Sequence, residues 1–118
     1  MQNSSLNTAS ARSSAAADIV LGPERDATLR RLARRYVWSE SPESVLRRPD
    51  GIHDLICQIL RLGTLQDFRT ASRVFGADAI REALISARPG QLDDRSWTFW
   101  HLVFGISPVP PAPRRQVI

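Results

Sequence analysis

The amino-acid sequence predicts an all-α protein, a small single-domain bundle of five to six helices. Two observations support this prediction. Apolar side chains recur at the 3.6-residue period of a helix, in stretches that capping residues, glycine or proline separate. No stretch shows the sustained alternation of apolar and polar residues that is typical of a strand. With 118 residues, the chain has room for one domain and one hydrophobic core.

The chain divides into three parts. Residues 1–22 are rich in Ser, Asn, Ala and Thr and poor in apolar side chains, which predicts a disordered arm. Residues 23–106 carry the helical periodicity and form the predicted domain. Residues 107–118 begin with alternating prolines, which cannot join a helix and favour an extended tail. We expect this tail to project from the last helix, so that truncation after Ser107 leaves the fold intact.

The first two helices are marked by an apolar stripe and by a capping sequence. From Arg25 to about Trp38, apolar residues share one face of a helix. Ser41 then caps a short helix that has Pro42 at its first position and should stop before Pro49. The stripe of the first helix comprises Leu29, Leu32, Ala33 and Tyr36.

Three further helices follow, and glycine or proline ends each of them. The third starts at Asp50 and should end at Gly63, in the left-handed C-cap that glycine favours. Thr64 caps the fourth, which ends at Gly76, and the fifth occupies residues 77–87. The side chains expected to face inward are Ile52, Leu55, Ile56, Ile59, Leu60, Leu65, Phe68, Ala71, Ser72, Phe75, Ile80, Ala83 and Leu84.

The last helix, capped by Asp93 or Asp94 and running to Gly105, contains two Trp and two Phe within eight residues. A helix that is apolar nearly all round lies in the core, or divides its surface between the core and a partner. We assign the side with both Trp residues to the core, and Phe99 on the other side to a partner. The predicted structural core comprises Ile56, Ile59, Phe68, Phe75, Trp97, Trp100 and Phe104.

The basic side chains are all Arg, and the formal net charge is +4. Four arginines lie on one side of the first helix, opposite its apolar stripe, where they can neutralise phosphates. They are Arg30, Arg31, Arg34 and Arg35, and we call them the basic arc. Like charges one turn apart destabilise a helix unless acids approach from elsewhere. The arc therefore fits an acidic partner, either nucleic acid or protein, and a solvated charged face is the alternative interpretation.

The sequence specifies no catalysis, cofactor or metal. His53 and Cys57 stand one turn apart, a spacing that can activate a thiolate, but they flank an apolar stripe and we interpret them as partly buried. One Cys and two His fall short of a structural zinc set. The helices around Gly76 have the outline of a helix-turn-helix, yet Asp78 and Glu82 would repel phosphates. We expect a protein that is not an enzyme.

Composition also bears on the compartment. The single cysteine cannot form an internal disulfide, which fits a reducing cytoplasm. No apolar stretch approaches the roughly 18 residues of a membrane span, and the N-terminus lacks the continuous apolar stretch of a signal peptide. We expect a cytoplasmic protein without membrane contact; the sequence leaves its oligomeric state open.

Five motifs, in chain order, resemble a group of short bacterial proteins encoded beside nucleotidyltransferase-like toxins of the abortive-infection type (the AbiEii class). The resemblance covers about two-thirds of the chain, and its most specific part is the aromatic helix followed by the Pro/Arg tail. It implies an antitoxin but supplies no catalytic or binding residues. The motifs are Tyr36-Val-Trp-Ser, Leu62-Gly-Thr, Phe75-Gly-Ala-Asp, Arg95-Ser-Trp-Thr-Phe-Trp-His and Val109-Pro-Pro-Ala-Pro-Arg-Arg.

The resemblance implies a protein-binding module of a toxin–antitoxin system, which neutralises its toxin by occluding the nucleotide or RNA site or by masking surface. The alternative function is a small nucleic-acid-binding regulator that uses the Arg-rich helix 25–38. The candidate partner-binding residues are Arg30, Arg31, Arg34, Arg35, Phe99, Arg114 and Arg115.

Overall fold

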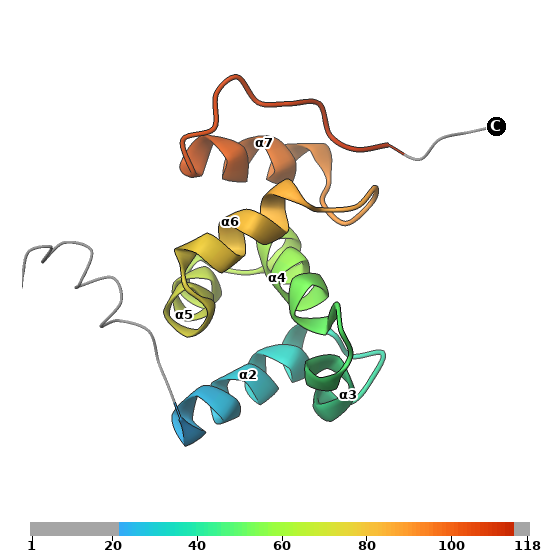
Figure 1. The fold of residues 1–118 in the computed structure, drawn as a ribbon, viewed down its shortest axis with the longest axis vertical. Helices are drawn as coiled ribbons and strands as arrows, with labels where there is room; N and C mark the ends of the chain where they lie inside the picture. The colour runs from blue at the N-terminus through green and yellow to red at the C-terminus, as the bar shows by residue number, and fades with distance from the viewer. Residues whose placement is uncertain (1–21, 115–118) are drawn as a thin grey trace, which may run out of the picture.

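Six helices and no strand make up residues 22–114, the part of the chain that the computed structural model describes (Figure 1). The predicted all-α class is confirmed for these residues. The predicted disordered arm lies outside them, apart from Gly22. None of the described helices is long and apolar enough to cross a membrane. The helices are α2 (Pro23–Tyr36), α3 (Pro42–Arg47), α4 (Gly51–Leu62), α5 (Leu65–Phe75), α6 (Ala77–Ile85) and α7 (Asp94–Val103).

Helix α4 lies at the centre of the bundle and contacts each of the other five described helices. Its sequence explains this position, because six of its 12 residues are buried, including Leu55, Ile56 and Ile59. A helix that is apolar over most of its surface must be covered on several sides. Helices α2 and α3 pack at one end of the molecule, and α7 lies at the other (Figure 1).

Three helices begin where the capping residues predict. The side chain of Ser41 accepts the N–H of Ser44 at 3.1 Å, and Thr64 accepts the N–H of Asp67 at 3.0 Å. Asp93 caps α7 in the same way. Each cap satisfies a backbone N–H that has no partner inside the helix, which stabilises the helix by about 1 kcal/mol.

The first helix begins and ends two residues earlier than predicted. Pro23 occupies its first position, where the missing N–H removes no intrahelical bond. Val37 has left the helix, and the side chain of Trp38 is 72% exposed in the turn that follows.

The left-handed cap predicted at Gly63 is wrong. Gly63 has φ −76° and ψ 161°, an extended conformation that any residue can adopt. A Cβ atom there would lie 2.5 Å from the carbonyl oxygen of Ile59 and 3.2 Å from the hydroxyl of Tyr36. Glycine is therefore required for close approach at this helix end. Gly76, by contrast, has φ 87° between α5 and α6, in the region that favours glycine.

Leu65 was expected to face inward, but 62% of its side chain is exposed, and Val74 is buried on α5 instead. The reason is helical register. Nine residues at 100° each place Leu65 and Val74 on opposite sides of the helix, so only one of them can face the core. Of the predicted core, Ile56, Ile59, Trp97 and Trp100 are buried, whereas Phe68, Phe75 and Phe104 are half-buried and pack against it.

The Pro-rich segment does not project from α7 as predicted. Residues 106–114 form no helix or strand, and they fold back along α7 (Figure 1). The indole N–H of Trp97 donates to the carbonyl oxygen of Pro110 at 2.7 Å. Val109 and Ala112 pack against the core. The packed structure thus continues past residue 106, because these side chains cover a part of α7 that would otherwise face water.

Candidate functional site

The four arginines predicted to form a basic arc on α2 have different partners. Arg30 pairs with Glu43 of α3. Arg35 pairs with Asp67 of α5 at 3.2 Å, and its guanidinium lies 5.7 Å from the centre of the Tyr36 ring. Arg31 and Arg34 are exposed, and no ion pair joins them to the described residues. Two acids of the same chain, Glu43 and Asp67, therefore reduce the repulsion among the arginines of this arc.

The predicted basic residues of the tail lie at the limit of the described chain. Arg114 is exposed and borders a surface hollow beside the loop that precedes α7, together with Pro89, Leu92 and Asp94. Arg115 lies outside the described residues.

Helix α7 divides its surface between core and solvent. Trp97, Trp100 and His101 are buried; His101 is held inside by a 2.7 Å hydrogen bond between its Nδ1 and the carbonyl oxygen of Trp97. Phe99 is 55% exposed, and its ring packs edge-on against Trp100 at 4.9 Å between ring centres.

Two further apolar side chains lie beside Phe99. Leu102 and Val103, three and four residues later on the same side of α7, are 57% and 50% exposed. Sequence reasoning identified Phe99 and placed Val103 on its side of the helix, but it missed Leu102. The i, i+3 spacing from Phe99 was the available signal. We call Phe99, Leu102 and Val103 the α7 face.

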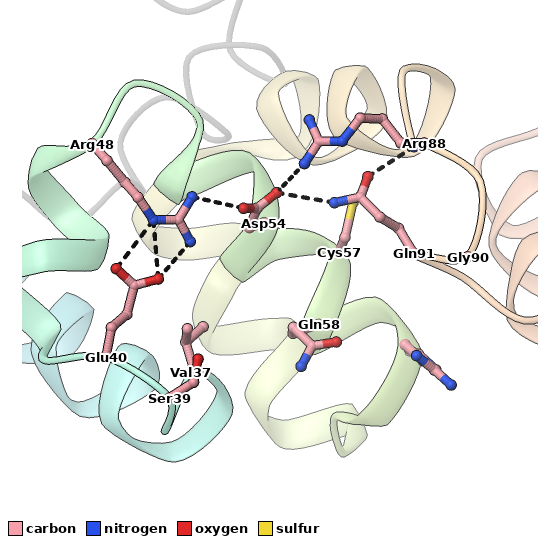
Figure 2. A pocket seen from close by; sticks show the side chains of 11 residues that line it. Val37, Ser39, Glu40, Arg48, Asp54, Cys57, Gln58, Arg88, Gly90 and Gln91 are labelled. Carbon is pink, nitrogen blue, oxygen red and sulfur yellow. Dashed lines mark hydrogen bonds and ion pairs between the residues drawn. The ribbon is translucent and has the colours of Figure 1, made fainter.

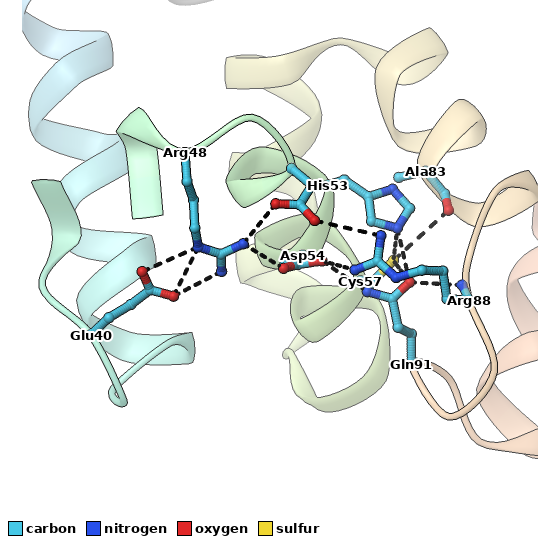
Figure 3. A network of polar contacts seen from close by, with 9 residues as sticks. Glu40, Arg48, His53, Asp54, Cys57, Ala83, Arg88 and Gln91 are labelled. Carbon is cyan, nitrogen blue, oxygen red and sulfur yellow. Dashed lines mark hydrogen bonds and ion pairs between the residues drawn. The ribbon is translucent and has the colours of Figure 1, made fainter. Parts of the chain in front are cut away.

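A network of charged side chains, which sequence reasoning missed, joins four segments of the chain (Figures 2 and 3). Arg48 pairs with Glu40 at 2.8 Å and with Asp54 at 2.7 Å. The other carboxylate oxygen of Asp54 pairs with Arg88 at 2.7 Å. Asp50 extends the network through its ion pair with Arg48. The network holds the α2–α3 turn, the α3–α4 turn, α4 and the α6–α7 loop together.

Gln91 links this network to His53 and Cys57. Its amide N–H donates to Asp54 at 2.9 Å, and its amide oxygen accepts the backbone N–H of Arg88 at 2.8 Å. These bonds fix which side of the amide is oxygen, and that oxygen lies 2.8 Å from Nε2 of His53. Nε2 must therefore carry the proton and donate it to Gln91.

The same geometry leaves the Cys57 thiol without a base. Its sulfur lies 3.7 Å from Nε2 of His53, but a nitrogen that donates to Gln91 cannot also accept the thiol proton. Burial, together with the negative charge of Asp54, raises the pKa of Cys57 to about 12. The thiol is protonated at neutral pH. Cys57 is 1% exposed and therefore more deeply buried than the sequence predicts, whereas His53 is half-buried as predicted.

A cavity of about 290 Å³ opens beside the network (Figure 2). Most of the charged groups at its edge pair with one another, so we interpret the network as a structural clamp rather than a ligand site. No group of three or more His, Cys, Asp or Glu among residues 22–114 is placed to hold a metal ion. The lining includes Glu40, Arg48, Asp54, Cys57, Arg61 and Arg88.

The clamp predicts how stability depends on pH. Partial burial raises the pKa of Asp54, but hydrogen bonds from Arg48 and Arg88 outweigh it and hold the pKa below its usual value. A depressed folded pKa means that this stabilisation is complete above the unfolded pKa of about 3.9 and is lost as pH falls through the folded pKa. We expect Asp54→Asn to lower the free energy of unfolding at pH 7 by about 1–3 kcal/mol.

Urea denaturation at several pH values tests this prediction. The difference between Asp54→Asn and the unmodified protein should begin to shrink below about pH 4, where the unfolded state binds the proton, and should be lost once the pH has fallen through the lower folded pKa. Asp78→Asn is the matched control, because Asp78 is exposed and has no ion pair with the described residues. A difference that persists unchanged at pH 2 would show that the charge of Asp54 is not the cause.

The structure separates the predicted partner-binding residues into distant surfaces. The arginines of α2 and the α7 face lie on helices at opposite ends of the molecule, and α2 and α7 make no direct contact (Figure 1). No family model, no curated protein and no solved structure matches this chain.

Proposed function

We propose that this chain is a non-enzymatic protein-binding module that docks through the α7 face. The observation that carries the proposal is the exposure of three large apolar side chains, Phe99, Leu102 and Val103, within five residues of one helix. Apolar area left in water is unfavourable by about 25 cal/mol per Å², and a partner that covers it gains this free energy. Clustered apolar exposure of this kind is typical of interaction sites.

The position of Phe99 also favours binding. Its ring rests against Trp100, which is itself fixed by stacking on Phe68 at 4.4 Å and by a 2.7 Å hydrogen bond to the carbonyl oxygen of Leu60. An aromatic side chain that is already held in place loses little conformational entropy when a partner covers it. Such side chains are common among the residues that dominate binding energy.

The resemblance of the motifs to antitoxin-like proteins supplies the proposed partner, a nucleotidyltransferase-type toxin in the cytoplasm. The side chains of the motif Arg95-Ser-Trp-Thr-Phe-Trp-His differ in exposure, and this difference supports the proposal. Trp97, Trp100 and His101 point into the core, and Phe99 is left for contact with another molecule. Binding would inactivate the toxin either by occluding its nucleotide or RNA site or by masking surface.

Affinity measurements with the nucleotidyltransferase encoded by the neighbouring gene test the proposal. We expect the double variant Phe99→Ala/Leu102→Ala to bind at least about 30-fold more weakly, since hot-spot residues contribute about 2 kcal/mol or more and 1.4 kcal/mol is tenfold. Ile85→Ala is the matched control, because Ile85 is an exposed apolar side chain on α6. Unchanged affinity in the double variant, or a neighbouring product that does not bind at all, would contradict the proposal.

A further inference from the structure

One tryptophan stands in solvent, in the turn between α2 and α3. The side chain of Trp38 is 72% exposed, more than that of any other large apolar residue in the described part of the chain. Within that part, no hydrogen bond or aromatic contact joins its indole ring to another group. A ring of this size is unfavourable in water, so a molecule that covers it gains free energy.

The turn that carries Trp38 is fixed on both sides. Before it, the backbone N–H of Val37 donates to the last turn of α2 at 2.8 Å. After it, Glu40 pairs with Arg48 at 2.8 Å and so belongs to the clamp. Val37 and Ser39 line the cavity beside the clamp, whereas Trp38 between them does not (Figure 2). The clamp therefore holds the backbone of this turn in place, and a ring on a fixed backbone loses less entropy when it is bound.

Positive charge lies beside the exposed ring. Arg34 comes four residues before Trp38, so their Cα atoms are at most about 15 Å apart, and Arg31 is one turn earlier on α2. Both arginines are exposed, and no ion pair joins either of them to the described residues. The acids that approach α2, Glu43 and Asp67, pair with the other two arginines of the basic arc. We call Trp38, Arg31 and Arg34 the Trp38 site.

The neighbours of the ring distinguish this site from the α7 face. Phe99 lies beside two exposed apolar side chains, Leu102 and Val103, as expected where a protein docks. Trp38 has exposed arginines nearby instead. An aromatic ring next to exposed arginines matches the chemistry of a single-stranded nucleic acid, whose bases stack on the ring and whose phosphates pair with the guanidinium groups. A duplex fits less well, because its bases already stack on one another.

We infer that the Trp38 site binds single-stranded nucleic acid, with one base stacked on Trp38 and phosphates on Arg31 and Arg34. The inference does not rest on the proposed function, since α2 and the α7 face lie at opposite ends of the molecule (Figure 1). Sequence reasoning placed nucleic acid on the four arginines of the basic arc and missed Trp38. Ion pairs within the chain leave two of those four for phosphates, so binding should be weak and should depend moderately on salt.

Fluorescence anisotropy with labelled oligothymidylate and oligouridylate of about 12 nucleotides tests the inference on the full chain. The logarithm of the association constant should fall against the logarithm of salt concentration with a slope of about −1.4, roughly 0.7 for each of two phosphates. Trp38→Ala should weaken binding at least about fivefold at every salt concentration without changing the slope, because base stacking involves no charge. Arg31→Gln/Arg34→Gln should bring the slope close to zero. Tighter binding of one probe would identify DNA or RNA as the ligand.

Two controls separate the site from general surface charge. Arg69→Gln/Arg73→Gln removes two arginines of α5 that are also exposed, one turn apart and without an ion pair to the described residues. This variant should alter affinity by less than about twofold. Trp38→Phe keeps an aromatic ring and should retain most of the binding. It also identifies the indole N–H signal of Trp38 in nitrogen-15 NMR spectra of the full chain, which should shift when an unlabelled probe is added.

Four results would each overturn the inference. The first is no saturable binding of either probe at about 50 mM salt. The second is an equal loss in the α2 and α5 variants, which would show an effect of net charge alone. The third is tighter binding of a duplex that Trp38→Ala does not weaken. The fourth is a Trp38→Ala protein that binds oligonucleotides normally but binds the neighbouring nucleotidyltransferase more weakly, which would make the turn part of a protein interface.

Discussion

Replacement of Trp100 by alanine is expected to lower the free energy of unfolding by about 3–5 kcal/mol, the usual cost of emptying an aromatic site in a core. Trp100 is 9% exposed, stacks on Phe68 with ring centres 4.4 Å apart, and joins α7 to α4 and α5. Because most domains are stable by only about 5–15 kcal/mol, the variant should lose a large part of its stability and melt at a clearly lower temperature.

Two control variants separate the contributions of Trp100. Trp100→Phe keeps a ring against Phe68 but removes the indole N–H that bonds to the carbonyl oxygen of Leu60, one of the last four carbonyls of α4. The loss of this hydrogen bond should lower the free energy of unfolding by about 1–3 kcal/mol. Trp38→Ala should change stability by less than about 0.5 kcal/mol, because Trp38 is 72% exposed.

Urea denaturation followed by far-ultraviolet circular dichroism measures these differences without relying on tryptophan fluorescence. A Trp100→Ala protein with an unchanged midpoint, and with weaker binding to its partner, would contradict the assignment of this side of α7 to the core. That result would mean that the partner binds the side of α7 that carries Trp100.

Truncation after Ser107 is the second change with a large expected effect. The sequence predicts that the fold stays intact after this truncation. The structure adds that the free energy of unfolding should fall by roughly 2–3 kcal/mol. About 1 kcal/mol comes from the hydrogen bond between Trp97 and Pro110, and the rest from the apolar contacts of Val109 and Ala112.

Truncation after Arg114 is the matched control, because it keeps Val109, Pro110 and Ala112 in place. Chemical denaturation of the two truncated proteins should show a lower midpoint for the shorter one only. Equal midpoints would mean that the packing of residues 107–114 on α7 contributes nothing to stability. The variant Val109→Ser should reproduce part of the loss without shortening the chain.

The sequence by itself determined where three of the helices begin. Caps at Ser41, Thr64 and Asp93 act on backbone groups three residues away, so they can be recognised locally. The burial of Trp97 and Trp100 was also predictable, since both lie on one face of a short aromatic helix.

The tertiary structure decided which charged groups meet. Arg30 and Glu43 are 13 residues apart, and Asp54 and Arg88 are 34 apart, so no spacing rule predicts that they pair. As a result, two of the four arginines of the basic arc on α2 form ion pairs, whereas the arginines of α5 form none with the described residues.

The path of the Pro-rich segment was also decided by packing. Prolines exclude a helix, and the sequence predicted that much, but they do not set the direction in which an extended chain leaves α7. That direction follows from the indole N–H of Trp97, which needs an acceptor at the edge of the core and finds it at Pro110. Local sequence determines the conformation of such a segment, and the buried groups that it must satisfy determine where it lies.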